Sequence, residues 1–68
     1  MIRLRVKEVA GAKGISQSKL SRLSDINITT IQLMYRKPAD TNITLHTLNR
    51  LCHALGVSPA DLLEYSRD

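Results

Sequence analysis

The sequence has few of the residues that cross-link a chain or interrupt its regular structure. Its 68 residues include one cysteine, two prolines and three glycines, and it has no Trp or Phe. Cys52 has no second cysteine to pair with, so no internal disulfide forms and a cytoplasmic location is expected. No apolar run approaches the roughly 18 residues of a membrane span, and basic residues interrupt the N-terminal stretch where a signal peptide would be apolar. We expect a single small domain over residues 1–68.

The patterns that support catalysis or metal binding are also missing. His46 and His53 lie seven residues apart, about two helical turns, which is too far for a shared metal. Cys52 falls in an apolar stripe and is expected in the core. Gly11 and Gly14 do not form a phosphate-binding loop, and no nucleophile elbow is present. We therefore expect no enzyme activity, no metal and no cofactor.

Positive charge is concentrated in the first half of the chain. Residues 1–37 contain eight Lys or Arg against two acidic residues, whereas residues 38–68 contain two Arg against four acidic residues. A basic half suits a polyanion, because neutralised phosphates release their counterions. A basic amphipathic helix over 5–13 would also suit a membrane surface, but it lacks Trp or Phe anchors and contains Gly11. No membrane partner is expected.

Four segments have the pattern of a helix start, in which a capping residue is flanked by an apolar pair. The capping residues are Ser16, Asn27, Thr44 and Ser58. The first two starts lie eleven residues apart, which leaves room for about two helical turns and a short connection. Two short helices joined so tightly must cross steeply, as in a helix-turn-helix, which offers its second helix to the DNA major groove.

Stop signals complete the predicted helices. Gly14 and Gly56 follow the first and fourth helices, Pro38 follows the third, and Pro59 stands at the first position of the fifth. The predicted helices cover residues 5–13, 17–24, 28–36, 45–55 and 59–65. The fold class is therefore all-α, a compact bundle of about five short helices.

Residues 2–6 alternate apolar and basic side chains, as a strand does. Two interpretations stay open: a frayed first turn that packs Leu4 against the core, or a short strand that pairs with its copy in a second subunit. The apolar periodicity of the helices predicts the following core: Val6, Val9, Ala10, Leu20, Leu23, Ile26, Ile31, Met34, Leu45, Leu48, Leu51, Cys52, Leu55, Val57, Leu62 and Leu63.

The segments ISQSKLSRLSDINITTI and LHTLNRLCHALGVSPADLL together make the chain resemble the Cro/repressor-type (Xre family) helix-turn-helix proteins of bacteria and phages. The resemblance covers nearly the whole chain and implies a lambda repressor-like DNA-binding domain with its motif at about 16–36. Gln17 matches the family's usual first motif residue. Ser21 stands where Ala is usual, and Asp25 where Gly is usual at the turn. Asp is among the residues that tolerate a left-handed backbone.

The resemblance implies which residues contact double-stranded DNA. The family's base-reading positions map onto Ile28, Thr29, Gln32 and Leu33, and Arg36 lies one turn further along. Gln can bond adenine, and Arg guanine, through two hydrogen bonds each. The alternative for Ile28 or Leu33 is packing in the core or against a partner chain. Tyr35 could equally cover the core or donate to a phosphate.

Phosphate contacts are expected from the two helix starts that flank the groove and from residues beside the recognition helix. These residues are Ser16, Gln17, Thr30, Lys37, Asn42, Thr44, His46 and Thr47. Each of them alone is more often a solvated surface group. Lys19 and Arg22 are further candidates.

The sequence supports two candidate functions. The first is a small transcriptional regulator, a repressor that binds an inverted repeat as a homodimer, joined by its N-terminal segment, by the C-terminal helix with Leu63 and Tyr65, or only on DNA. The second is an antitoxin-like protein whose main target is a partner protein, favoured by apolar Ile28 and Leu33 on the outer helix face.

Overall fold

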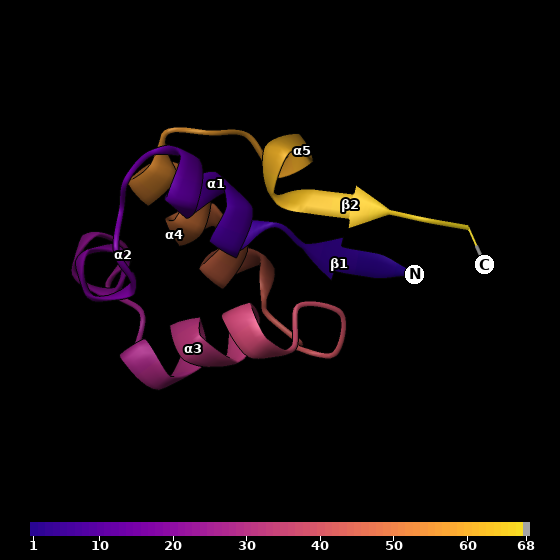
Figure 1. Ribbon diagram of the computed structural model, residues 1–68, viewed down its shortest axis with the longest axis horizontal. Coiled ribbons are helices and arrows are strands. Elements are labelled where there is room, and N and C mark those ends of the chain that lie inside the picture. Colours follow the sequence, from indigo (N-terminus) through magenta and orange to yellow (C-terminus); the bar gives the residue numbers. More distant parts are fainter. Residues whose placement is uncertain (68) are drawn as a thin grey trace.

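Five helices and one short two-stranded ribbon make up the structure, a computed structural model that describes residues 1–67 (Figure 1). The elements follow the order β1 (Ile2–Leu4), α1 (Val6–Ala12), α2 (Gln17–Ser24), α3 (Ile28–Arg36), α4 (Leu45–Leu55), α5 (Pro59–Leu62) and β2 (Leu63–Tyr65). The mainly helical fold class is confirmed, and the predicted bounds of α2, α3 and α4 coincide with the observed ones. No helix among these residues is long and apolar enough to cross a membrane.

The predicted capping residues do begin their helices. Ser16 Oγ accepts the Lys19 N–H at 3.2 Å, and Thr44 Oγ1 accepts the Thr47 N–H at 3.0 Å. At α5 the side chain that accepts is that of Asp61 inside the helix: its carboxylate accepts the N–H of the capping residue Ser58 at 3.1 Å. These bonds satisfy backbone groups that a helix end leaves without a partner, so local sequence fixes where the helices start.

The end of the chain corrects one prediction. Residues 63–65 do not continue the last helix: α5 ends at Leu62, and β2 pairs antiparallel with β1, with Ile2 opposite Tyr65 and Leu4 opposite Leu63. Of the two interpretations of residues 2–6, a strand does form, but its partner lies in the same chain and not in a second subunit. Leu4 also packs into the core with 5% of its surface exposed. The alternation of Leu63, Glu64 and Tyr65 suits a ribbon with one apolar face.

The core lies where the helices meet. Its most deeply buried large side chains are Leu20, Ile31, Met34, Leu51, Leu62 and Val6. Two predicted core residues are wrong: Leu23 is 50% exposed and Leu45 is 85% exposed. Leu45 is the first residue of α4 and lies beyond the edge of the core, whereas the inward face of α2 is completed by buried Ser24, whose hydroxyl donates to the Leu20 carbonyl at 2.6 Å.

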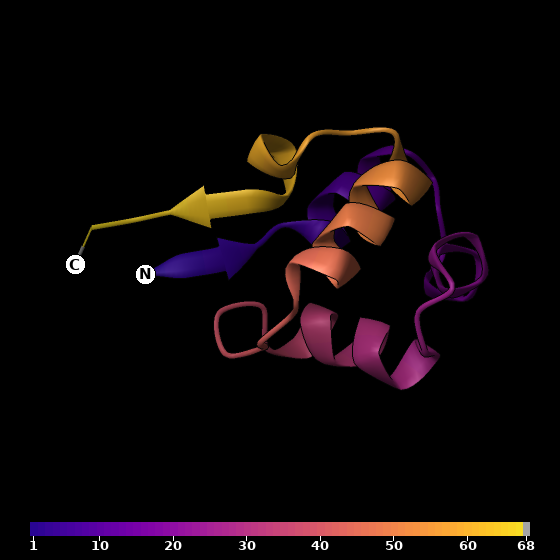
Figure 2. The ribbon, with the colours of Figure 1, turned by 180° about the vertical axis from the view of Figure 1, so that it is seen from behind.

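The ribbon projects from the helical body along the longest dimension of the molecule. Figure 1 and Figure 2 show both strands extending away from the helices, with the N-terminus near the free end. The principal dimensions are 35 × 21 × 21 Å. The Leu4 N–H donates to the Pro38 carbonyl at 2.9 Å, which places the loop after α3 against the outer edge of β1. The carboxyl end of α3 therefore lies on the ribbon side of the molecule.

Candidate nucleic-acid interface

The connection between α2 and α3 is a short turn held by specific hydrogen bonds. Asp25 ends α2 in the left-handed conformation (φ 57°, ψ 38°), and its N–H donates to the Ser21 carbonyl. The Ser21 hydroxyl donates to the Ile26 carbonyl at 2.5 Å, and the Arg50 guanidinium donates to the Asp25 carbonyl at 3.1 Å. Asn27 then caps α3 by accepting the Thr29 N–H at 2.8 Å. These contacts fix the angle at which α3 leaves α2.

α3 has one buried face and one exposed face. Ile31 and Met34 point inward, with 0% and 1% of their surfaces exposed. Thr29, Gln32 and Arg36 are exposed and follow one another at spacings of three and four residues, which places them on a single outward stripe. Figure 1 shows α3 along one side of the molecule, next to α2. Three of the predicted base-reading residues therefore share a surface that a DNA groove can reach.

The two apolar base-reading candidates on α3 are less exposed than the three polar ones. Ile28 is half-buried and packs against the core, and Leu33 is also half-buried. The Leu33 carbonyl accepts a bond from the Thr41 hydroxyl at 3.3 Å, which ties this part of α3 to the loop that follows it. Sequence periodicity placed both residues on or near the outer face, but neighbouring segments cover part of each side chain.

The predicted phosphate-contacting residues lie around α3 in three groups. Ser16 and Gln17 are at the start of α2, with Ser16 exposed and Gln17 half-buried. Thr30 and Lys37 belong to α3 and its end, with Thr30 half-buried and Lys37 exposed. The third group, at and before the start of α4, consists of Asn42, Thr44 and His46, which are exposed, and Thr47, which is half-buried. At each of the two helix starts the hydroxyl cap engages one backbone N–H, and the first two N–H groups of the helix have no partner within it.

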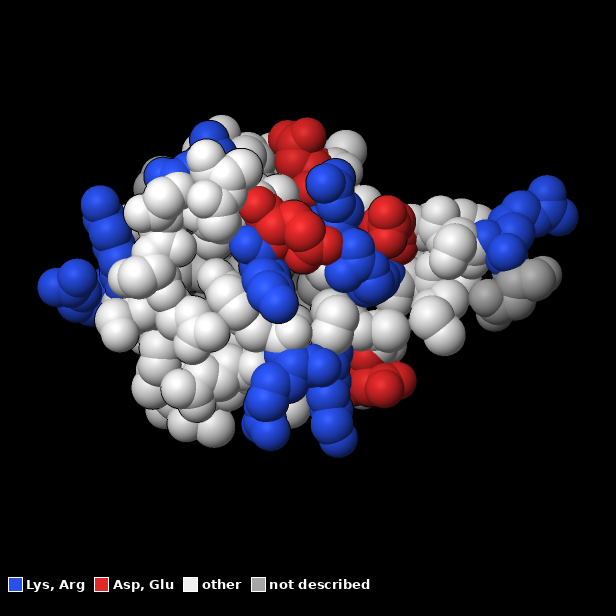
Figure 3. Space-filling view, in the orientation of Figure 1, with Lys and Arg blue, Asp and Glu red and all other residues white. Residues whose placement is uncertain are grey.

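Charge is arranged unevenly over the surface. Figure 3 shows Lys and Arg side chains projecting at the α2 end of the molecule and beneath α3, whereas several acidic side chains gather towards α5 and β2. The exposed cations on these two helices and just after α3 are Lys19, Arg22, Arg36 and Lys37. Within residues 1–67 none of them forms an ion pair. Their charges are therefore available to a polyanion.

Other basic residues are engaged within the fold. Arg3 bonds Glu8 at 2.5 Å and Glu64 at 2.9 Å. The hydrogen bond from Arg3 lowers the pKa of the Glu8 carboxyl, and these carboxylates raise the pKa of Arg3. Arg50 holds the turn at Asp25. Both residues stabilise the fold. Arg3 belongs to the basic half of the sequence, so that half has less charge free for binding than its composition indicates.

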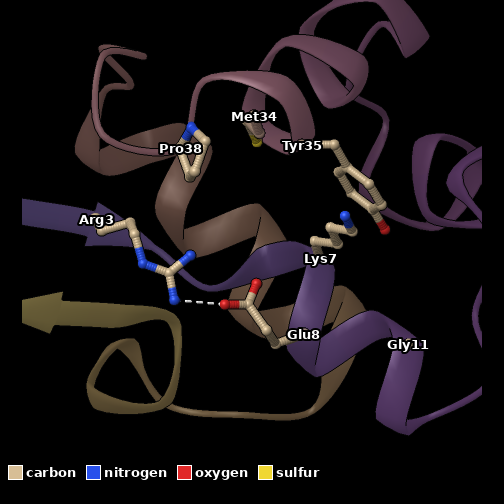
Figure 4. A pocket seen from close by; sticks show the side chains of 7 residues that line it. All are labelled: Arg3, Lys7, Glu8, Gly11, Met34, Tyr35 and Pro38. Carbon is tan, nitrogen blue, oxygen red and sulfur yellow. Dashed lines mark hydrogen bonds and ion pairs between the residues drawn. The ribbon is translucent and has the colours of Figure 1, made fainter.

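A surface hollow of about 420 Å³ lies between β1, α1 and the end of α3. Figure 4 shows the Arg3–Glu8 pair on one side of it and Lys7 extending towards Tyr35 on the other. Tyr35 is half-buried, and desolvation raises the pKa of its hydroxyl. The ring of Tyr35 therefore covers the core while its edge reaches the surface. Among residues 1–67, no three His, Cys, Asp or Glu side chains lie close enough together to hold a metal ion.

A model of the Cro/C1-type HTH DNA-binding domain matches residues 5–68. The chain belongs to the Cro/C1-type helix-turn-helix family. The match covers the turn, α3 and the start of α4, which are the elements that carry the exposed polar stripe and the surrounding cations. A comparison with curated proteins gave no match.

Two features of this Cro/C1-type domain were missed by sequence reasoning. The Arg50 contact with Asp25 joins residues 25 positions apart, and no local pattern indicates it. β2 could have been suspected, because Leu63-Glu64-Tyr65 has the same apolar-charged-apolar order as Ile2-Arg3-Leu4. The opposite charges of Arg3 and Glu64 then suit a cross-strand pair.

Proposed function

We propose that the chain is a sequence-specific transcriptional regulator that binds an inverted repeat in double-stranded DNA as a homodimer and acts as a repressor in the cytoplasm. The observation that carries this proposal is the exposed stripe of Thr29, Gln32 and Arg36 on α3, together with cations on α2 and beyond the end of α3 that form no ion pair within residues 1–67. Repression needs only occupancy of the DNA. No catalytic activity and no cofactor are part of the proposal.

Different residues contact the bases and the phosphates. Gln32 presents an amide suited to adenine N6 and N7, and Arg36 presents a guanidinium suited to guanine O6 and N7. Each good bidentate contact discriminates between bases by roughly 1–3 kcal/mol. Lys37, together with the starts of α2 and α4, contacts phosphates, which sets the position of the domain on the duplex without reading sequence.

A single short helix contacts too few base pairs to select a site, so two copies are required. Two copies related by a two-fold axis place their recognition helices in successive turns of the major groove, about 34 Å apart. Each recognition helix then lies about 17 Å from the two-fold axis, which is less than the 35 Å length of one copy. The operator is therefore expected to be an inverted repeat whose half-sites are separated by one helical turn.

Selection of binding sites from a random duplex library tests this function. Enrichment of an inverted repeat with one-turn half-site spacing is expected. A library that stays random after several rounds, with only salt-sensitive retention of the duplex, would contradict sequence-specific binding.

The alternative, an antitoxin-like protein that mainly binds another protein, draws on exposed apolar side chains. Leu23 and Leu45 supply such surface, whereas half-buried Ile28 and Leu33 supply less than their spacing suggested. The salt dependence of binding separates the two functions. Neutralised phosphates give a steep fall in affinity with salt, whereas an apolar protein contact is nearly insensitive to it.

A further inference from the structure

The turn between α2 and α3 is held from two sides. On one side, hydrogen bonds tie it to α2: the N–H groups of Asp25 and Ile26 donate to the Ser21 carbonyl, and the Ser21 hydroxyl donates to the Ile26 carbonyl. Among residues 1–67, one hydrogen bond reaches the turn from outside α2 and α3. It runs from the Arg50 guanidinium to the Asp25 carbonyl over 3.1 Å and joins the turn to α4.

Arg50 bonds the backbone of Asp25 and forms no ion pair with its carboxylate. A helix leaves its last carbonyl groups without a partner of its own, and at the end of α2 the side chain from α4 supplies one. The guanidinium is planar and stays charged in proteins, so the bond is directional and does not depend on pH.

The far end of α3 is fixed by a different contact. The Thr41 hydroxyl donates to the Lys37 carbonyl at 2.6 Å, just beyond the last turn of the helix. This bond does not involve Arg50. Loss of the Arg50 bond therefore loosens the start of α3 while its carboxyl end stays held, which displaces Gln32 more than Lys37.

We propose that Arg50 is a positioning residue for base recognition: it sets the placement of α3 relative to the start of α4 and does not itself contact DNA. The proposal deepens the proposed function, since it rests on α3 reading bases and the start of α4 contacting phosphates. Arg50 lies six residues after the capping residue Thr44, about 9 Å along the same helix. α4 thus joins phosphate contacts at one point to the reading helix at another.

A directional bond matters here because base-reading groups must be held to within about 0.5 Å. α2 also packs against α4, and Leu20 and Leu51 are fully buried. Apolar burial has no preferred direction, and packed helices slide past each other by small amounts. A hydrogen bond prefers one distance and one angle. Arg50 is half-buried and its bond lies at the surface, where water replaces it, so its loss should affect placement more than stability.

The ratio of affinities for the selected duplex and a scrambled duplex tests the proposal. Arg50→Met keeps the apolar stem but loses donors and charge, and it should lower this ratio by about tenfold, comparable with the loss of one bidentate base contact. Lys13→Met is the control for lost charge, because Lys13 is exposed and forms no ion pair within residues 1–67; it should leave the ratio unchanged. Arg50→Lys keeps the charge and one donor group, so its ratio should lie between those of Arg50→Met and the wild type, and it carries the comparison if Arg50→Met fails to fold.

A direct contact between Arg50 and a phosphate predicts a different result. Arg50→Met would then weaken binding to both duplexes equally and reduce the salt slope by about one. Positioning leaves the salt slope at the value of the Lys13→Met control. Equal weakening on both duplexes, or a ratio that Arg50→Met does not change, would overturn the proposal. Asp25→Asn keeps the backbone carbonyl and should retain the full ratio; a loss as large as that of Arg50→Met would also overturn it.

NMR of the chain without DNA tests the contact independently of the DNA function. The Ile26 amide belongs to the same peptide group as the Asp25 carbonyl, so Arg50→Met should shift the Ile26 amide resonance more than that of Lys37. Lys13→Met should shift neither. A folded Arg50→Met chain with an unmoved Ile26 resonance would overturn the proposal. A wild-type chain that binds both duplexes equally would refute the DNA function instead, and the Ile26 resonance would still report whether Arg50 holds the turn.

Discussion

The left-handed residue between α2 and α3 offers a stability change whose sign follows from the structure. Asp25 has φ 57° and is the one non-glycine residue with positive φ among residues 1–67. That conformation costs an L-residue roughly 1–2 kcal/mol, and somewhat less for Asp, whereas glycine adopts it freely. The carboxylate also lies at the carboxyl end of α2, where a negative charge opposes the helix dipole by about 0.3–1 kcal/mol.

Asp25→Gly should therefore raise the free energy of unfolding. Relief of backbone strain and loss of the charge together favour the variant, and the greater freedom of glycine in the unfolded chain opposes it by about 0.4–1 kcal/mol. The net gain is expected to be about 1 kcal/mol, which raises Tm by about 4–8 °C in a domain of this size. Urea unfolding followed by far-UV circular dichroism measures the change directly.

Two control variants separate the contributions. Asp25→Asn removes the charge but keeps a side chain that tolerates the left-handed region, so it isolates the dipole effect. Gly56→Ala is the opposite experiment: Gly56 has φ 67°, and an added Cβ meets no atom within 4 Å, so backbone strain in the folded chain, partly offset by the lower freedom of alanine in the unfolded chain, decides the change. It should lower stability by about 1 kcal/mol. Destabilisation by Asp25→Gly, with Gly56→Ala neutral, would refute this reasoning.

Three further predictions concern the core, the ribbon and the single thiol. Ile31→Ala should lower the free energy of unfolding by about 2–5 kcal/mol, because it leaves a cavity in a fully buried site. An unchanged midpoint of urea unfolding, followed by circular dichroism, would contradict the packing described. Arg3→Ala should lower stability at neutral pH only slightly, since both of its ion pairs are partly exposed and solvent screens them. Arg3 lowers the pKa of Glu8, so the stabilisation by the Arg3–Glu8 pair should be present above the pKa of Glu8 in the unfolded chain and be lost as pH falls through its pKa in the folded chain. A stability difference between the wild type and Arg3→Ala that does not change with pH would exclude this contribution. Desolvation, followed by the Asp61 charge, raises the pKa of the Cys52 thiol, so iodoacetamide should alkylate the folded chain more slowly than the urea-unfolded chain.

Most of the helical architecture is local in origin, which is why the sequence predicts it well. Capping residues such as Ser16 and Thr44 bond backbone groups only three residues away, and Gly56 ends α4 within its own last turn. The inward face of α3 follows equally from the spacing of Ile31 and Met34. These features need no knowledge of the rest of the chain.

The features that were wrong or missed depend on distant partners. Leu62 and Leu63 continue a helical spacing, but Leu63 becomes extended because Leu4, more than fifty residues away, offers it a strand partner. Leu23 is apolar and was expected in the core, yet half of its surface is exposed. Likewise, partial burial of Ile28 reflects tertiary packing that the periodicity of α3 does not contain.

The assignment of bases to α3 remains a prediction, because contacts with DNA depend on how the domain docks. Exposure of Thr29, Gln32 and Arg36 makes them available to a groove. Which base each one meets depends on the operator, and that information lies in the DNA.

The central claim is that α3 reads sequence while its surroundings hold phosphates. The most direct test compares the affinities of the wild type, Gln32→Ala and Lys37→Ala for the selected duplex and for a scrambled duplex at one fixed salt concentration. Gln32→Ala should weaken binding to the selected duplex by about 1–3 kcal/mol and leave binding to the scrambled duplex unchanged. Lys37→Ala should weaken both about equally and flatten the salt dependence. Equal losses on both duplexes from Gln32→Ala would contradict the claim that α3 reads the bases.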